Sequence, residues 1–211
     1  MDEITRQYRD ALRLLFILAR AGDVPTGNPA VPGAVRVITS EKKLQKMDFW
    51  VRNPDHFAYA LLQANNDDAS LGYLAAAQSI ADSEEPEIRR DAMVKFLYGA
   101  YEPLDTALAP LFSCGLARMA RALETRQRTY FLLPEGLACA DQMEAELPEA
   151  KWYSERAALV GDFCKGKSGD QLARWQYRHP TYSGAKHGET IKSIAHEVRQ
   201  LLVAASEASN A

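Results

Sequence analysis

One short stretch of the sequence carries the pattern of a phosphate-binding loop. The segment GDFCKGKSGD begins at Gly161 and contains G-x-x-x-x-G-K-[ST] in full, with Gly166, Lys167 and Ser168 at the expected spacing. In nucleotide-binding proteins such a loop follows a buried strand and opens a helix, so that its backbone amides hold phosphate oxygens and its lysine balances their charge. Taken alone, this pattern would predict an ATPase or a GTPase.

The residues around this loop do not supply the sheet that nucleotide chemistry needs. The preceding segment, YSERAALV, suits a helix as well as a strand, and the sequence after Ser168 contains no convincing strand. Upstream, no series of alternating strands and helices offers a strand that ends in an aspartate for magnesium. We therefore expect a turn between two helices, with Ser168 capping the second helix. Nucleotide binding through Lys167 is kept as an alternative.

Other reactive side chains lack the partners that catalysis would require. The candidate metal ligands and nucleophiles among the histidines and cysteines are His56, His179, His187, His196, Cys114, Cys139 and Cys164. No two histidines stand at the i, i+4 spacing with a carboxylate that zinc enzymes use, and no serine lies in G-x-S-x-G. The cysteines do not form C-x-x-C pairs and are predicted to be packed thiols. We therefore expect a protein that is not an enzyme and holds no metal or cofactor.

Composition and charge are those of an ordinary folded protein. The chain has 211 residues, of which 47% are hydrophobic and 25% are charged, enough for one domain or two small ones. No apolar run is long enough to cross a bilayer, and the first residues carry both signs of charge, unlike a signal peptide. We therefore expect a cytoplasmic protein without a membrane partner. The net charge of −3 gives no general attraction to nucleic acid, so DNA contact would need a local basic patch.

Hydrophobic spacing predicts a mainly α-helical chain with one small β-hairpin. Periodicity, caps and breakers indicate helices over residues 4–20, 40–53, 55–63, 71–80, 86–98, 104–114, 135–146, 154–163, 170–177 and 187–205. A short strand is expected over 35–38. The segments LARMARA and RTYFLLP bracket the polar LETRQ as two strands bracket a turn.

The order of these elements indicates a winged helix-turn-helix core. Helix, helix and then a two-stranded hairpin is the winged-helix order, and it falls within residues 41–150. We expect an N-terminal helix and a connector rich in Pro and Gly over 1–40 before this core. A further helical region is expected over 151–211 after it.

Four arginines fall on the expected wing, where side chains can meet phosphate oxygens without reading any base. They are Arg118, Arg121, Arg126 and Arg128. The preceding helix, LDTALAPLFSCG, has no Arg, Lys, Asn or Gln for base edges in the major groove. We therefore expect this winged helix to contact protein, with non-specific contact to double-stranded DNA as an additional role. A winged-helix DNA-binding transcriptional regulator is the alternative.

Four longer segments share a pattern with a known family. They are KLQKMDFWVRNPDHFAYAL, MVKFLYGAYEPLDTALAPLFSCGL, LLPEGLACADQM and LARWQYRHPTYSGAKHGETI. The positions that match the pattern are Met47, Asp48, Phe49, Arg52, Pro54, Gly99, Pro103, Asp105, Gly115, Leu116, Tyr177, Pro180, Gly188, Glu189 and Ile191. Together these segments resemble the middle components of ABC-three-component, or Lamassu-type, bacterial defence systems, although the turn GAYEPLD departs from the family's tighter form.

The resemblance implies a non-enzymatic winged-helix subunit that joins an SMC-like ATPase to a separate effector, commonly a nuclease, in defence against phage or plasmids. ATP would then be consumed by another chain, in agreement with a turn at Lys167. The family has no catalytic residues to carry over, only packing and turn positions. We expect Asn53 and Pro54 to end one helix and start the next, and Gly188-Glu189 to start the last helix.

Overall fold

The chain is mainly helical with a small antiparallel sheet, and it divides into two compact units. The computed structural model describes residues 3–27, 29–83, 93–96, 99–100, 104–121 and 127–209. The first unit comprises Met1–Asp48 and Glu102–Leu172, and the second comprises Phe49–Tyr101 and Ala173–Ala211. Each unit is thus built from two separate stretches of sequence, unlike the three consecutive segments 1–40, 41–150 and 151–211 that we expected.

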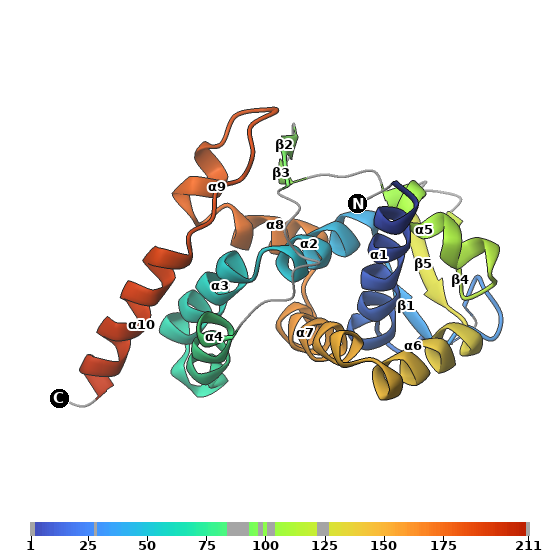
Figure 1. The fold of residues 1–211 in the computed structure, drawn as a ribbon, viewed down its shortest axis with the longest axis horizontal. Coiled ribbons are helices and arrows are strands. Elements are labelled where there is room, and N and C mark those ends of the chain that lie inside the picture. The colour runs from blue at the N-terminus through green and yellow to red at the C-terminus, as the bar shows by residue number, and fades with distance from the viewer. Residues whose placement is uncertain are drawn as a thin grey trace. The chain divides into compact units, whose positions relative to one another are not determined.

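The first unit contains most of the helices that the sequence predicts. The helix expected over 4–20 is present but ends differently, because its last turn widens into a π-helix in which all residues except Arg20 are buried. The elements are α1 (Glu3–Phe16), η1 (Ile17–Ala21), α5 (Leu104–Ser113), α6 (Pro134–Glu146) and α7 (Pro148–Cys164) (Figure 1). The boundary between the units falls within α2 (Glu41–Arg52) and within α8 (Gly169–Gln176).

The sheet of the first unit has three antiparallel strands in the order β1-β5-β4. The predicted hairpin is confirmed as β4 (Ala117–Arg121) and β5 (Arg128–Leu132), with Arg121 opposite Arg128. The predicted short strand is β1 (Arg36–Ile38), which pairs with β5 so that Arg36 lies opposite Leu132 (Figure 1). The pairing of β1 with β5 was not predicted, because the two strands are far apart in the sequence.

A buried ion pair joins α1 to α2 inside the first unit. Arg13 donates from Nε to Asp48 Oδ1 at 2.6 Å, and from a terminal nitrogen to Asp10 Oδ1 at 2.6 Å. Asp48 is 1% exposed and Arg13 is 5% exposed. Burial works against the charge of Arg13, but the two carboxylates outweigh it and raise the pKa of the guanidinium. The guanidinium therefore stays charged at every accessible pH.

The second unit packs α3, α4 and α10 around a small apolar core. Asn53 and Pro54 end α2 and start α3 as predicted, with Pro54 in the first helical turn, where its missing N–H costs nothing. The elements are α3 (Pro54–Asp67), η2 (Ala69–Leu71), α4 (Tyr73–Asp82), β2 (Lys95–Phe96), β3 (Gly99–Ala100), α9 (Pro180–Gly184) and α10 (Ala195–Ser209). Within the described residues, no helix combines the length and the apolar character needed to cross a membrane.

Two predicted helices of the second unit are wrong at specific residues. Of the helix expected over 86–98, the described part is extended instead: β2 pairs with β3, and the rest lies outside the described residues. The helix expected over 187–205 begins only at Ala195. Gly188 has a φ of +83°, and Glu189 does not begin a helix. Instead, the N–H of Gly188 donates to the carbonyl oxygen of Lys95, and the N–H of Lys95 donates to that of Glu189. Both segments have local helix signals, but they pair with each other in an extended conformation and are therefore not helical.

Candidate functional site

Each residue of the phosphate-loop pattern has a structural role in the first unit. A Cβ on Gly161 would lie 2.7 Å from the Cα of Ala21, so this glycine allows α7 to pack closely on η1. Gly166 has a φ of +69° and sits in the left-handed turn that follows α7. Ser168 and Gln171 cap α8 reciprocally, each side chain accepting the other's backbone N–H at 3.3 and 2.8 Å. The predicted turn with Ser168 as cap is confirmed.

The side chain of Lys167 is directed at the C-terminal end of α7, the helix before the turn. Lys167 Nζ donates to the carbonyl oxygen of Phe163 and lies 4.7 Å from the centre of the Phe163 ring. A lysine in this position satisfies a free carbonyl at the end of α7. The strands described in this unit are antiparallel, and α7 rather than a strand leads into the turn. The geometry of a phosphate-binding loop is therefore not formed.

The three arginines of the predicted wing that the structure describes do not form one basic cluster. Arg118 and Arg121 are exposed, and because they are three residues apart on a strand they project to opposite faces of the hairpin. Arg128 is bound instead to carboxylates at the start of two helices, Asp105 of α5 at 2.9 Å and Glu41 of α2 at 3.5 Å. Arg126 lies outside the described residues. Of the four predicted phosphate contacts, the structure leaves Arg118 and Arg121 as exposed cations.

The helix before the β4–β5 hairpin, α5, presents small and acidic side chains to solvent. The exposed residues of α5 are Asp105, Thr106, Ala109 and Ser113. Leu104, Leu108 and Leu111 are buried on the opposite face. No residue of this surface carries a positive charge or a base-reading amide, in agreement with the sequence. A phosphate backbone would gain no attraction here.

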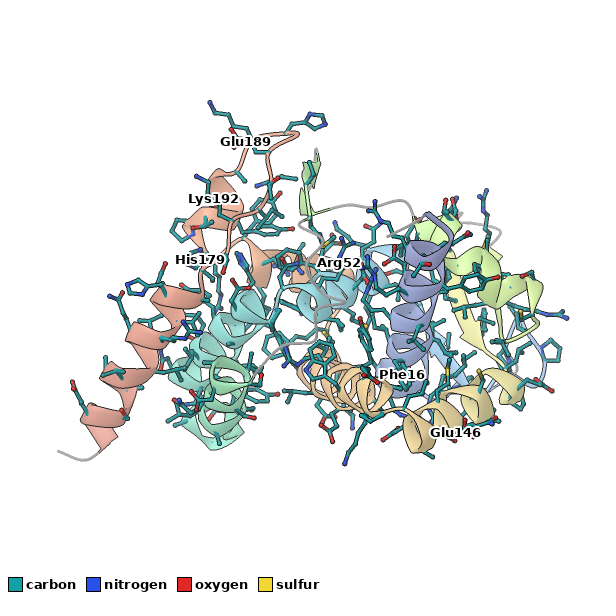
Figure 2. All side chains as sticks on the ribbon, viewed as in Figure 1. Phe16, Arg52, Glu146, His179, Glu189 and Lys192 are labelled. Carbon is teal, nitrogen blue, oxygen red and sulfur yellow. The ribbon has the colours of Figure 1, made fainter. Side chains whose placement is uncertain are left out.

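Two histidines pack against each other in the second unit. The rings of His56 and His179 are 5.7 Å apart and nearly perpendicular. His56 Nε2 lies 3.0 Å from the carbonyl oxygen of Lys192. His179 Nδ1 accepts the backbone N–H of Thr181 at 3.1 Å and so caps α9. His179 and Lys192 are labelled in Figure 2. Nε2 of His179 is buried and makes no aligned hydrogen bond, although Glu197 Oε2 lies 3.1 Å away. These contacts fasten α9 and the segment that leads into α10.

His187 and His196 are exposed. Within the described ranges, no three His, Cys, Asp or Glu side chains converge in a way that could hold a metal ion. Burial lowers the pKa of His56 and outweighs the charge of the neighbouring Asp55, so the ring is neutral near pH 7.

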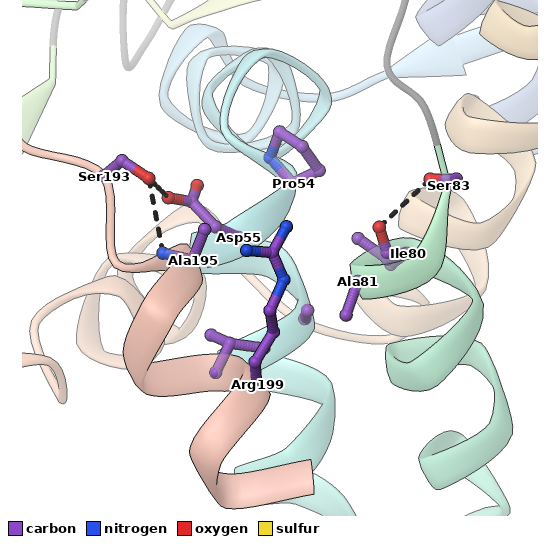
Figure 3. Close-up of a pocket in the computed structure, with 10 residues that line it drawn as sticks. Pro54, Asp55, Ile80, Ala81, Ser83, Ser193, Ala195 and Arg199 are labelled. Atoms are coloured by element: carbon purple, nitrogen blue, oxygen red, sulfur yellow. Dashed lines mark hydrogen bonds between the residues drawn. The ribbon is translucent and has the colours of Figure 1, made fainter.

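A small pocket between α3, α4 and α10 contains Asp55 and Arg199 (Figure 3). Asp55 Oδ2 accepts from Ser193 Oγ at 2.6 Å and from the backbone N–H of Ile194 at 2.7 Å. Its Oδ1 accepts the backbone N–H of His56 at 2.9 Å, so one carboxylate serves the N-termini of both α3 and α10. Burial opposes this charge, but His56 and these hydrogen bonds outweigh it and lower the pKa of Asp55.

This pocket is too small and too fully engaged to be an active site. Its volume is about 140 Å³, whereas pockets for small-molecule ligands measure about 300–1,000 Å³. Both oxygens of the Asp55 carboxylate are committed to hydrogen bonds, so it is not free to take a proton from a substrate. The pocket is best explained as part of the junction of three helices.

A buried lysine that the sequence gave no reason to select closes the end of α9. Lys95 is 5% exposed, and its Nζ donates to the carbonyl oxygens of Tyr182 at 2.5 Å and Ser183 at 3.0 Å. The same ammonium lies 4.8 Å from the ring centre of Tyr177 and 5.1 Å from that of Tyr182. Burial lowers the pKa of Lys95. The sequence predicted a helix through this residue, and only the extended pairing brings it to α9.

The cysteines occupy three different environments. Cys164 is buried, and burial raises the pKa of its thiol to about 12, so it is a packed and unreactive group. Cys139 is half-buried. Cys114 is exposed after the last turn of α5, so the prediction of a packed thiol is wrong for this residue. The three sulfur atoms are free and form no disulfide.

Comparison with known proteins identifies no relative. No protein-family model, no curated protein and no solved structure matches the chain.

Proposed function

We propose that the chain is a non-catalytic adaptor subunit of a bacterial defence complex, bridging an SMC-like ATPase and an effector, commonly a nuclease. The observation that carries this proposal is the order of elements in the first unit. Its chain runs α1, β1, α2, α5, β4, β5, and the sheet order is β1-β5-β4. In a winged helix the first strand likewise follows the first helix and lies beside the last strand of the hairpin, and α5 would occupy the place of the recognition helix.

The surface of α5 favours protein over DNA as the partner of this winged-helix-like unit. Its exposed side chains are short or acidic, and the carboxylate of Asp105 is already paired with Arg128. Such a surface lacks the donors that read base edges and the cations that hold phosphates.

The second unit adds a separate body to this core and so supports a bridging role. Residues 49–101 of the second unit, which begin within α2, are inserted before α5, at the point where a plain winged helix has a short turn. Two units in one chain can present two different docking surfaces. The structural roles of Gly161, Lys167 and Ser168 support the view that ATP is consumed by a different subunit.

Co-expression with the products of neighbouring genes tests this function. We expect the chain to elute from size-exclusion chromatography together with an SMC-like ATPase and an effector, in the cytoplasmic fraction and without a membrane. As a control, the ATPase and the effector expressed without this chain should elute separately. An ATPase–effector complex that assembles intact while this chain elutes alone would refute the adaptor role.

A winged-helix transcriptional regulator is the second candidate, favoured by Arg118 and Arg121, which are exposed and have no ion-pair partner among the described residues. A regulator should bind one DNA sequence in preference to others and lose affinity steeply as salt rises. Fluorescence anisotropy with labelled genomic fragments measures both properties. The absence of any sequence preference across salt concentrations would eliminate this candidate, whereas weak binding of all duplexes fits an adaptor with non-specific DNA contact.

A further inference from the structure

The outer edge of β4 is the exposed edge of the three-stranded sheet. β5 lies in the middle, so β1 and β4 are the edge strands (Figure 1). The edge of β1 is covered, because Val37 exchanges two backbone hydrogen bonds with Asp23, at 2.9 and 2.8 Å. No backbone segment in the described part of the chain pairs with the outer side of β4 in this way. Within the described residues, the edge of β1 is therefore paired with other backbone and the edge of β4 is not.

The register identifies the backbone groups on this edge. The N–H of Leu133 donates to the carbonyl oxygen of Leu116 at 3.0 Å, so Leu116 and every second residue after it face β5. Arg118 and Ala120 therefore use their N–H and C=O groups within the hairpin. The N–H and C=O groups of Met119 and Arg121 point outward, and they have no hydrogen-bond partner among the described residues.

Two uncompensated positive charges lie along the same edge. Arg118 and Arg121 are exposed, and no carboxylate of the described residues comes within ion-pair distance of either. Arg128, directly opposite Arg121, is neutralised by Asp105 and Glu41. Charges on an edge strand discourage pairing with neutral or basic strands. The same charges attract an acidic strand.

A surface pocket opens beside the first of these arginines. It has a volume of about 340 Å³ and reaches Arg118 from the loop before β1 and the start of α6. Its other lining residues are Val31, Pro32, Gly33, Leu133, Pro134 and Glu135. Strand-addition sites combine main-chain hydrogen bonds with pockets that receive alternate side chains of the added strand. The pocket adjoins Arg118 on the side of β1 and β5, because its other lining residues flank those two strands, so an added strand would be recognised through its backbone and its charges.

We propose that β4 binds an extended acidic segment of a partner polypeptide as an added fourth strand. Its backbone pairs with Met119 and Arg121, and two of its carboxylates, three residues apart, reach Arg118 on one face and Arg121 on the other. An added strand meets both arginines because its own side chains alternate between faces in the same way. A single DNA backbone would meet one face of the hairpin and so only one of them. The proposal rests on the proposed adaptor role and assigns it a docking mode.

A peptide assay with the full-length chain tests this edge directly. The probe is a synthetic peptide of about ten residues, alternating Thr and Val, with two glutamates three positions apart. A second peptide of identical composition has its glutamates two positions apart, on one face. Met119→Pro removes an outward N–H without removing a hydrogen bond of the hairpin, and Met119→Val is its matched control. Arg118→Glu combined with Arg121→Glu reverses the edge charge.

We expect the first peptide to bind the wild-type protein and Met119→Val alike, and to bind Met119→Pro and the double charge reversal about tenfold more weakly. A peptide with two lysines at the same spacing should prefer the double charge reversal. Equal binding to Met119→Pro and Met119→Val, or equal binding of both glutamate spacings, would overturn the proposal. If Met119→Pro unfolds at a lower temperature than Met119→Val, the result is decided by the other comparison. In it, the glutamate peptide should prefer the wild-type protein and the lysine peptide should prefer the double charge reversal.

Two further outcomes separate this inference from the adaptor role. If the ATPase and effector subunits co-purify with Met119→Pro as well as with the wild-type chain, the partner is held elsewhere; strand addition is refuted and the adaptor role stands. If the peptide results hold but no subunit co-purifies with the wild-type chain, the adaptor role fails and the binding property of β4 stands. Duplex DNA that binds through Arg118 and Arg121 while neither glutamate peptide binds would assign the arginines to phosphate and overturn the proposal.

Discussion

Replacing Gly161 by alanine tests the structural explanation of the phosphate-loop pattern. The added Cβ would lie 2.7 Å from the Cα of Ala21 and 3.2 Å from the carbonyl oxygen of Arg20. Carbon atoms pack best at about 3.5–4.0 Å, so α7 and η1 would have to separate by about 1 Å. The nearest atom belongs to the backbone and cannot rotate away. We therefore expect Gly161→Ala to destabilise the protein.

The magnitude follows from two opposing contributions. Overpacking of a filled site costs about 1–3 kcal/mol. Alanine in place of glycine inside a helix contributes about 1 kcal/mol in the other direction. Because the contact is with rigid backbone, we place the clash near the middle of its range and expect a net loss of about 1 kcal/mol, which corresponds to a fall in Tm of a few degrees.

Urea unfolding followed by far-UV circular dichroism measures this loss. The exposed Glu155 of the same helix supplies the control, since Glu155→Ala and Glu155→Gly differ only in helix propensity. The difference between those two variants is subtracted to isolate the clash at Gly161. A Gly161→Ala protein that is more stable than the wild type by the full difference between Glu155→Ala and Glu155→Gly would refute the close packing of α7 on η1. A Gly161→Ala protein with altered nucleotide binding and unchanged stability would support a phosphate-binding loop instead.

Three further predictions follow from side chains already described. Arg13→Met removes the guanidinium that lies 2.6 Å from the buried Asp48 carboxylate. We expect the free energy of unfolding in urea to fall by about 3–5 kcal/mol and to be largely recovered when Asp48→Leu is added. A fall below about 1 kcal/mol would contradict the buried pair. Lys167→Ala should leave the response to ATP and magnesium in calorimetry unchanged, and binding that disappears only in this variant would refute the helix-capping role. Burial lowers the pKa of His56 from its usual value of 6.5, so the unfolded chain binds more protons than the folded chain below that pH. The stability that His56 contributes should be full above pH 6.5 and should fall as the pH drops toward the folded pKa. Chemical denaturation measured across pH should show this dependence, and His56→Gln should flatten it.

The sequence allowed prediction of the elements whose signals are local. The boundary at Asn53 and Pro54, the hairpin β4–β5 and the capped turn at Ser168 were all predicted, because each depends on residues within a few positions of one another. A proline in the first turn, strands around a polar loop and a side-chain cap act in the same way in any protein context.

Long-range pairing explains what could not be predicted. Residues 93–96 and 189–191 were expected to be helical but lie extended, because Lys95 and Ile191 exchange backbone hydrogen bonds with partners in the other segment. Neither segment carries a sign of the other in its own sequence. Arg118, Arg121 and Arg128 lie on the hairpin strands as predicted, whereas Arg126 is outside the described residues. The binding of Arg128 to Asp105 and Glu41 depends on how α2 and α5 approach β5. Such contacts follow from the assembled fold and not from composition.

The interleaving of the two units constrains the order in which the protein can fold during synthesis. When Arg36 leaves the ribosome, Leu132, which pairs with it, has not yet been translated, so β1 must wait for its central strand. In that interval the inserted residues 49–101 are made, and the apolar residues of α1 have no completed core. The nascent first half of this chain is therefore a natural client for chaperones, and slowing translation before β5 should lower the yield of soluble protein.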